Sequence, residues 1–333
     1  MRRIGFRLLA VAVAVAGASL VAELALRVGG YSPAHVNPLK AFHVSDPVIG
    51  HRGSPGYEGR FLRPEFDIRV AHDEHGFRRP AAPVEPDRCE RRVLVYGDSF
   101  VWGWGISEGE LLTDRLAVLR PDLCVYNFGI NASGTAMQYT LFQHEHAELL
   151  TEGDTVVVIF YANDFSDNLR GQTLQGHIVE GQVQTVVVRR TLTHPARRWL
   201  KENSYLVNLV AYASDVWSLK RKRRREDASA RRVLDDSADS PELIVTRHYL
   251  QAFRTAVEAR GARLLVSIVP HDDPTFTAAL ARIADESGIE FHDVADEFLE
   301  EASGDGPALR YPLDGHWTPE GHRLMARLLA ERL

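Results

Sequence analysis

The segment most informative about the fold is Arg92-Val93-Leu94-Val95-Tyr96-Gly97-Asp98-Ser99-Phe100, which predicts a buried strand followed by a turn that carries a serine. The first five residues are mainly apolar and β-branched or aromatic, without the polar alternation of a half-exposed strand. Such a run is typical of a strand that is covered on both faces in a parallel sheet. Gly97 permits a tight turn, and Ser99 then follows the strand at its carboxyl end, where open α/β sheets place their active sites.

Four more apolar runs of strand length follow along the chain, and helical patterns separate them. The alternation of strand and helix predicts a three-layer α/β/α sandwich with a central parallel sheet of about five strands and right-handed crossovers. The final helix is predicted to begin with Thr318 as N-cap and Pro319 at its first position. The four runs are Cys124–Phe128, Thr155–Tyr161, Leu264–Val269 and Ile289–Val294.

Composition and charge exclude several classes of protein. The chain is 45% hydrophobic and 25% charged, which rules out wholesale disorder and a polytopic membrane protein. Its 39 basic and 45 acidic residues sum to a net charge of −6, so no nucleic-acid partner is expected. Cys89 and Cys124 are the two cysteines, which excludes a disulfide-rich scaffold. We expect two buried thiols, with a single disulfide as the alternative.

The first 30 residues have the pattern of an export signal. Arg2, Arg3 and Arg7 precede an uninterrupted apolar run from Leu8 to Ala22. The apolar helix pattern continues past the small residues 16–18, which could serve as a cleavage site. We therefore expect residues 1–30 to form an uncleaved membrane anchor, with the rest of the chain outside the cytoplasm. Cleavage and secretion are the alternative.

The remainder divides into three parts. Residues 31–90 are rich in glycine and proline and predict an irregular, β-containing lead-in, and residues 91–333 form the main domain. Residues 165–245 interrupt that domain with a hairpin near Gly176–Val183 and a helix that carries Leu206, Val210 and Trp217 on one face. This insertion is either a cap over the site or a packing helix with a surface loop. The basic run Lys220–Arg225 is interpreted as a solvated segment.

Polar groups suited to acyl chemistry occur at the predicted strand ends. Ser99 is a candidate nucleophile after the first strand. Gly129, after the second, leaves its N–H open to a bound oxygen, and the amide of Asn163, after the third, can donate to an oxyanion. Near the C-terminus, Asp314 precedes His316 by two positions and can hold its imidazole in one tautomer.

Taken together, these segments resemble the conserved blocks of the SGNH hydrolases, also called the GDSL esterase/lipase family. The matching blocks are Gly97-Asp98-Ser99, Gly129, Asn163-Asp164 and Asp314-Gly315-His316, and the resemblance covers roughly residues 91–333 without the insertion. The lead-in His75-Gly76-Phe77-Arg78 is similar to that of bacterial members with an N-terminal membrane helix. Two departures stand out. Tyr161 replaces the usual glycine of the third block, and the short Asp-x-His spacing resembles that of polysaccharide O-acetyltransferases.

The resemblance implies a serine esterase that works through an acyl-enzyme intermediate. Ser99 would attack the ester, His316 would act as base and then acid, and Asp314 would orient His316. The N–H groups of Ser99 and Gly129 and the amide of Asn163 would form the oxyanion hole, and no metal or cofactor is required. The expected substrate is an ester-bearing small molecule, a lipid or an acylated glycan. The alternatives are an O-acetyltransferase that modifies an exported polysaccharide, and a non-catalytic anchored binding protein.

Overall fold

The structure is a computed structural model of the chain. It describes residues 2–31, 42–171, 173–188, 199–200, 203–214, 216–218, 240–271, 273–304 and 306–333. The basic run Lys220–Arg225, interpreted above as solvated, lies outside the described residues.

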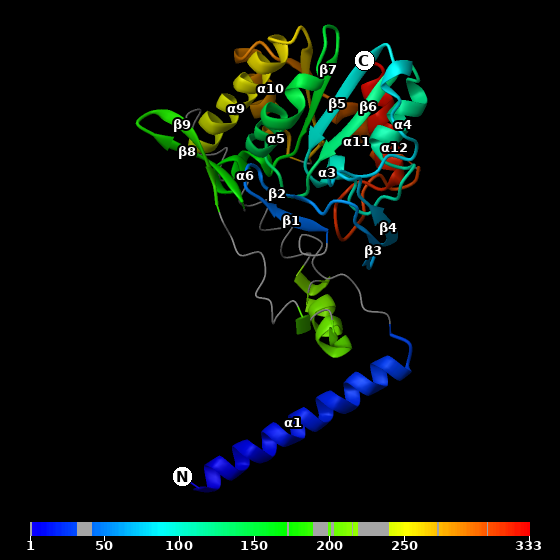
Figure 1. Cartoon of the computed structure of the whole chain (residues 1–333), viewed down its shortest axis with the longest axis vertical. Coiled ribbons are helices and arrows are strands. Elements are labelled where there is room, and N and C mark those ends of the chain that lie inside the picture. Colours follow the sequence, from blue (N-terminus) through cyan, green and yellow to red (C-terminus); the bar gives the residue numbers. More distant parts are fainter. Residues whose placement is uncertain are drawn as a thin grey trace.

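A five-stranded parallel sheet forms the centre of the main domain, as predicted (Figure 1). The strand order is β11-β10-β7-β5-β6, and every neighbouring pair is parallel. From β5 the chain crosses to β6 on one side and then to β7 on the other. The carboxyl ends of β5 and β7 therefore flank the point where the winding reverses, which is where ligands bind in open α/β sheets. The strands are β5 (Arg91–Gly97), β6 (Leu123–Gly129), β7 (Thr155–Phe160), β10 (Arg263–Ile268) and β11 (Glu290–His292).

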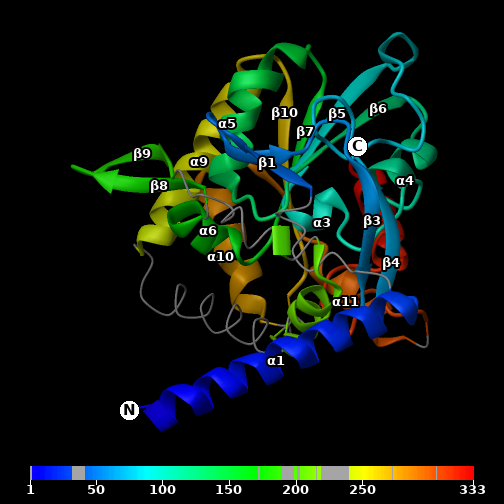
Figure 2. The same ribbon diagram turned by 60° about the horizontal axis from the view of Figure 1, so that its bottom comes forward.

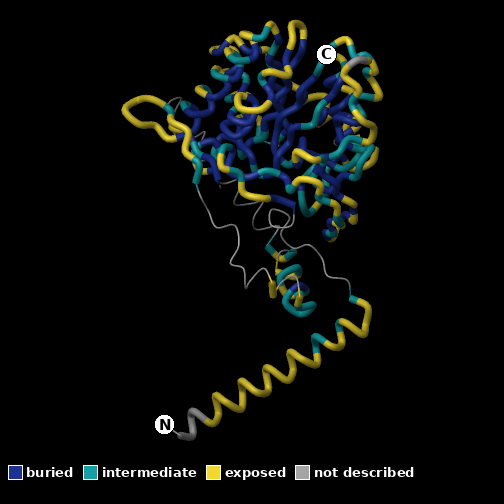
Figure 3. Tube along the Cα trace, in the orientation of Figure 1, coloured by how far each residue is buried: buried dark blue, intermediate teal, exposed yellow. Residues whose placement is uncertain are grey.

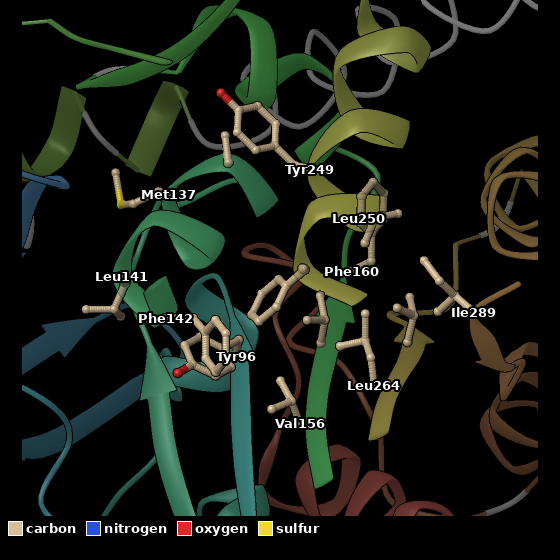
Figure 4. Packing of buried hydrophobic residues seen from close by; sticks show 14 of the residues in the cluster. Tyr96, Met137, Leu141, Phe142, Val156, Phe160, Tyr249, Leu250, Leu264 and Ile289 are labelled. Carbon is tan, nitrogen blue, oxygen red and sulfur yellow. The ribbon is translucent and has the colours of Figure 1, made fainter. Parts of the chain in front are cut away.

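Helices cover both faces of this sheet, because its strands are apolar on both sides. Alternate residues of β5 enter different cores: Leu94 and Tyr96 pack on one face, and Val93 and Val95 on the other. Figure 4 shows the first core, in which Phe142, Phe160 and Leu250 lie between the sheet and its helices. The first face is covered by α5 (Thr135–Leu141), α9 (Pro241–Glu258) and α10 (Pro274–Glu286), and the second by α4 (Leu112–Leu119), α11 (Ala295–Ser303) and α12 (Pro319–Ala330).

The predicted start of the final helix is confirmed. The Thr318 hydroxyl accepts a hydrogen bond from the Gly321 N–H, so Thr318 caps α12 as expected. The helical segment between β6 and β7 is less regular, since α5 passes at Leu141 into a π-helical turn, Phe142–His146, and then a 3-10 turn, Ala147–Leu149.

The lead-in forms two antiparallel hairpins and is tied to the main domain by aromatic side chains. Phe42, Phe61 and Phe66 are buried in one cluster with Trp102, which lies just after Ser99 in the chain. The lead-in thus contains short strands, and its apolar side chains pack against the segment that carries the candidate nucleophile. The first hairpin pairs β1 (His43–Asp46) with β2 (Gly50–Gly53), and the second pairs β3 (Glu58–Arg63) with β4 (Phe66–Ala71).

The expectation of two buried thiols is wrong. Cys89 and Cys124 form a disulfide, with their Cα atoms 5.4 Å apart. Cys89 comes just before β5, and Cys124 lies in β6 opposite Arg92 of β5. Because β5 and β6 are neighbours in the sheet, the two cysteines meet at the same end of the strand pair. The spacing of 35 residues gives no hint of this meeting, since it depends on the pairing of the strands.

The N-terminus is one long helix, α1 (Arg2–Val28). Within the described residues it is the one helix long and apolar enough to cross a membrane, over Phe6–Val28, with a mean hydropathy of 2.2. Figure 3 shows that this helix is exposed along most of its length. The insertion contains the predicted hairpin, formed by β8 (Leu174–Val179) and β9 (Gln182–Val187), and residues 205–214 are helical, as expected.

Candidate active site

The Ser99 side chain is presented by a short helix at the carboxyl end of β5. This helix, α3 (Ser99–Trp102), has Asp98 as its N-cap, and the Asp98 carboxylate accepts a hydrogen bond of 2.9 Å from the Phe100 N–H. Asp98 and Phe100 are buried, whereas Ser99 between them is partly exposed. The strand, the tight turn and the cap thus hold the serine hydroxyl at the surface of a rigid element.

His316 meets Ser99 across 217 residues of sequence. The distance from Ser99 Oγ to His316 Nε2 is 2.7 Å, and the other ring nitrogen, Nδ1, is hydrogen-bonded to Asp314 Oδ1. The His316 side chain keeps 21% of its surface exposed, while the Asp314 side chain keeps 5%. The imidazole can therefore reach a bound molecule, and the carboxylate behind it is shielded. Three predicted site residues are brought together in the order hydroxyl, imidazole, carboxylate.

The backbone can turn sharply between Asp314 and His316 because the residue between them, Gly315, is a glycine. Its φ is 90°, in the left-handed region that favours glycine. The loop closes on itself through bonds from Tyr311 N to His316 O and from Gly315 N to Tyr311 O, each of 2.8 Å. This turn places the Asp314 carboxylate against the ring of a residue only two positions away.

Two residues that the sequence analysis did not assign hold the Asp314 loop. Trp104 donates its indole N–H to Asp314 Oδ2 over 3.1 Å, and its ring stacks on His316 with 5.2 Å between centroids. Glu65, in the turn between β3 and β4, accepts the backbone N–H of Leu313 at 2.8 Å and that of Asp314 at 2.7 Å. No sequence motif links residue 65 to residue 314, because the contact depends on how the lead-in folds back.

The charges around Asp314 favour its ionised form. Burial acts to raise the pKa of Asp314, but the charge of His316, the hydrogen bonds from His316 and Trp104, and the charge of Arg63 hold that pKa below its ordinary value. An ionised Asp314 accepts the Nδ1–H of His316 and leaves Nε2 free to accept the serine proton.

Asn163 lies at the carboxyl end of β7, before α6 (Asp164–Arg170). Its side chain makes no helix-capping bond; instead its amide donates to Asp167 at 3.0 Å and also lies within hydrogen-bonding reach of Asp98. The structure thus places Asn163 next to the residue that precedes Ser99. Among the described residues, its amide oxygen has no partner.

Gly129 is pressed against the nucleophile helix. A Cβ at this position would lie 2.3 Å from Trp102 N, so α3 can approach β6 this closely only because the residue is glycine. In this structure the Gly129 N–H donates to the Asn127 amide oxygen over 3.0 Å. Binding an oxyanion at Gly129 therefore requires that bond to be exchanged, and the predicted role of this N–H stays a prediction.

Two fully buried carboxyls lie behind the site. Burial raises the pKa of Asp98 to about 6, against the opposing effects of the Phe100 N–H, His316 and Asn163. Burial together with the neighbouring Asp98 and Asp167 raises the pKa of Asp164 well above its ordinary value. Two neighbouring carboxyl groups that are shielded from water do not both ionise readily, because their negative charges repel each other. In the sequence, Asp164 stands out only as a member of the Asn163-Asp164 block.

The fold and this geometry define a class: a three-layer α/β/α protein with a serine, histidine and aspartate aligned at the carboxyl edge of its sheet. No protein-family profile and no curated protein matches the chain. Among the described residues, no cluster of three or more histidine, cysteine or acidic side chains could hold a metal ion.

Solved structures with overall similarity are described as lipolytic proteins and esterases. A lipolytic protein of the G-D-S-L family from Desulfitobacterium hafniense is 13% identical, with a TM-score of 0.44 over 73% of this chain and 100% of that one. A lipase/acylhydrolase from Enterococcus faecalis is 11% identical, with a TM-score of 0.40 over 73% and 94%. A catalytic mutant of an acetylxylan esterase from Geobacillus stearothermophilus is 14% identical, with a TM-score of 0.41 over 73% and 94%.

Proposed function

We propose that this chain is a serine esterase of the SGNH type, which hydrolyses a carboxylic ester through an acyl-enzyme intermediate. The observation that carries the proposal is the alignment of Ser99 Oγ, the two ring nitrogens of His316 and the Asp314 carboxylate. Such an alignment activates a weak nucleophile by giving its proton a nearby base, and gives that base a fixed tautomer.

The steps follow from these positions. Ser99 Oγ attacks the ester carbonyl as His316 Nε2 takes the hydroxyl proton, and Asp314 stabilises the imidazolium that forms. His316 then returns the proton to the leaving alkoxide, which leaves an acyl group on Ser99. Water then attacks this acyl group as His316 Nε2 takes its proton, and the imidazolium returns that proton to Ser99 Oγ as the carboxylic acid leaves. The N–H of Ser99 binds the oxyanion in both halves, together with the Asn163 amide and the Gly129 N–H after these exchange their present bonds to Asp167 and Asn127.

The site is tethered close to a membrane if α1 acts as an anchor. Eleven residue steps separate Tyr31, after α1, from Phe42, which stacks on Trp102 with 5.6 Å between centroids. At full extension these steps span about 40 Å. Trp102 in turn neighbours Trp104, which stacks on His316. An ester carried by a lipid or by a glycan near the outer face of the membrane lies within this distance.

Anchoring is tested by extracting membranes at alkaline pH. An anchored full-length protein should stay in the membrane fraction.

The first experiment compares the wild-type chain with Ser99→Ala on p-nitrophenyl esters of short acids. Turnover should fall by at least about a thousandfold, because the nucleophile is removed while the fold is kept. A fluorophosphonate probe should label the wild-type protein and not the variant. Retained turnover together with retained labelling would refute the assignment. The assay is then repeated with sugars as acyl acceptors. Release of free acid indicates hydrolysis, whereas acylated sugar indicates acyl transfer.

A further inference from the structure

The helical residues 205–214 of the insertion are joined at their N-terminal end to α1. The Tyr205 and Leu206 N–H groups each donate to the Glu23 carboxylate over 2.9 Å, and the Ser204 hydroxyl does so at the same distance. These are groups that the first turn of a helix leaves unsatisfied, and a carboxylate is the partner they favour. Glu23 of α1 therefore acts as the cap of a helix about 180 residues further along the chain.

Further contacts extend this junction along the last turns of α1. Arg27 donates to the Asn203 carbonyl over 2.8 Å, and its guanidinium lies 4.5 Å from the centre of the Tyr205 ring. Past the end of α1, the Tyr31 hydroxyl donates to the Asn208 side-chain oxygen over 3.0 Å. Glu23 and Arg27 lie within the last six residues of the apolar stretch Phe6–Val28, and Tyr31 follows it. The insertion helix is thus attached where a spanning α1 would leave the bilayer.

The insertion helix also carries apolar side chains that are not buried against the rest of the chain. Val210 is 60% exposed, and in the helical turn before it Trp199 is 62% exposed and Leu200 44% exposed. Figure 3 shows exposed segments in this part of the molecule beside α1. Val210, Ala213 and Trp217 recur at helical spacing, whereas the buried Asn208 lies toward Tyr31. The N-terminal end of this helix therefore lies against the last turns of α1, and its outward face is apolar (Figure 2).

We propose that this helix lies on the membrane surface, with its apolar face in the headgroup region of an anionic bilayer. Three observations select a bilayer as the occupant. The helix is attached at the end of a membrane-length apolar helix, its outward face carries tryptophan together with aliphatic residues, and six consecutive basic residues follow at Lys220–Arg225 in the sequence. This role for the insertion differs from a cap over the site, and it rests on the proposed anchoring by α1.

The test uses Val210→Cys in the full chain, since both native cysteines are joined in a disulfide and the new thiol can be labelled alone. An environment-sensitive NBD probe is attached, and the protein is reconstituted into vesicles of phosphatidylcholine with or without phosphatidylglycerol. The expected result is a blue shift, an emission several-fold higher with phosphatidylglycerol, and quenching by lipids brominated near the headgroup. Glu297→Cys, on the exposed surface of α11, is the matched control and should remain quenched by aqueous iodide.

A second substitution tests the junction itself. Glu23→Ala removes the carboxylate that holds the helix, so the probe at position 210 should lose much of its lipid quenching while the protein still floats with the vesicles. The proposal is overturned if, in the protein that retains Glu23, iodide quenches the probe at position 210 as strongly as the control probe at position 297. It is also overturned if that probe responds to fluorophosphonate modification of Ser99 and not to lipid. Neither readout uses ester turnover, and flotation reports anchoring separately.

Discussion

The short helix that carries Ser99 and the loop that carries His316 are held in different ways. Ser99 follows directly on a buried strand and an Asp98 cap, and its short helix packs on Gly129 and, through Trp102, on the lead-in. His316 is held by side chains from far away, with Glu65 and Trp104 fixing the Asp314 backbone and carboxylate. The Ser99 side chain is thus oriented by the strand and cap next to it in sequence, whereas the Asp314–His316 pair is oriented by side chains distant in sequence. The two halves of the site should therefore fail in different ways when they are perturbed.

The largest effect on the histidine half is expected from Asp314→Asn. Trp104 donates to Oδ2, so the single oxygen of the asparagine amide should turn toward Trp104 and its NH2 toward His316. His316 would then carry its proton on Nε2 and could not accept one from Ser99. We expect kcat to fall by about 10³–10⁴-fold, as such tautomer reversals do.

Trp104→Phe sharpens this prediction, because it keeps a ring against His316 and removes the indole donor. In that background, Asp314→Asn should cost less than it does alone, since the amide oxygen is free to turn to His316. The measurement is a double-mutant cycle on kcat. Strictly additive losses would contradict the proposed orientation of the amide.

On the nucleophile half, Asn163→Ala should lower kcat by about 10²–10³-fold with little change in KM, the usual cost of one oxyanion donor. Asp167→Asn is the matched control, since it changes the partner of the Asn163 amide and leaves the amide in place. If both variants retain wild-type kcat, the Asn163 side chain does not bind the oxyanion.

A smaller effect is expected from Glu65→Ala, which removes both acceptors of the Leu313 and Asp314 N–H groups. Glu65 is a positioning residue, so kcat should fall by roughly tenfold as two hydrogen bonds to a charged acceptor are lost. Glu65→Gln keeps one oxygen acceptor and should recover part of the loss, and KM should change little in either variant.

Glu58→Ala is the control for Glu65, because it lies on the same hairpin and pairs with Arg69 and Arg79. It should leave kcat unchanged. Equal losses from Glu58→Ala and Glu65→Ala would mean that the hairpin acts only through its overall stability.

The smallest effect concerns the buried carboxyls behind Ser99 and is an effect on stability. Folding raises the pKa values of Asp98 and Asp164 above the ordinary 3.8, so the pair favours the folded state fully only below that pH. Its contribution is lost as the pH rises through the raised values. Asp164→Asn should therefore reduce the fall in Tm between about pH 4 and about pH 8, by about 2–4 °C for each kcal/mol recovered. Asp285→Asn, on an exposed part of α10, should leave the pH slope unchanged.

The amino-acid sequence by itself determined the layered fold, the five strands and the capped final helix. These features depend on apolar runs and turn residues that lie next to one another in the chain, and such patterns are read locally. The same holds for Ser99, since its strand, glycine and cap are contiguous. The apolar N-terminal helix also follows from the sequence pattern of its own residues.

Only the tertiary structure decided the rest. The Cys89–Cys124 disulfide, the support of Asp314 by Glu65 and Trp104, and the capping of the insertion helix by Glu23 each join residues from separate elements. A carboxylate such as Glu65 looks like any surface acid in the sequence, because its partners are backbone N–H groups that every residue possesses. Which N–H group it meets is set by how the hairpins pack on the sheet, and the packing free energy is a property of the whole chain.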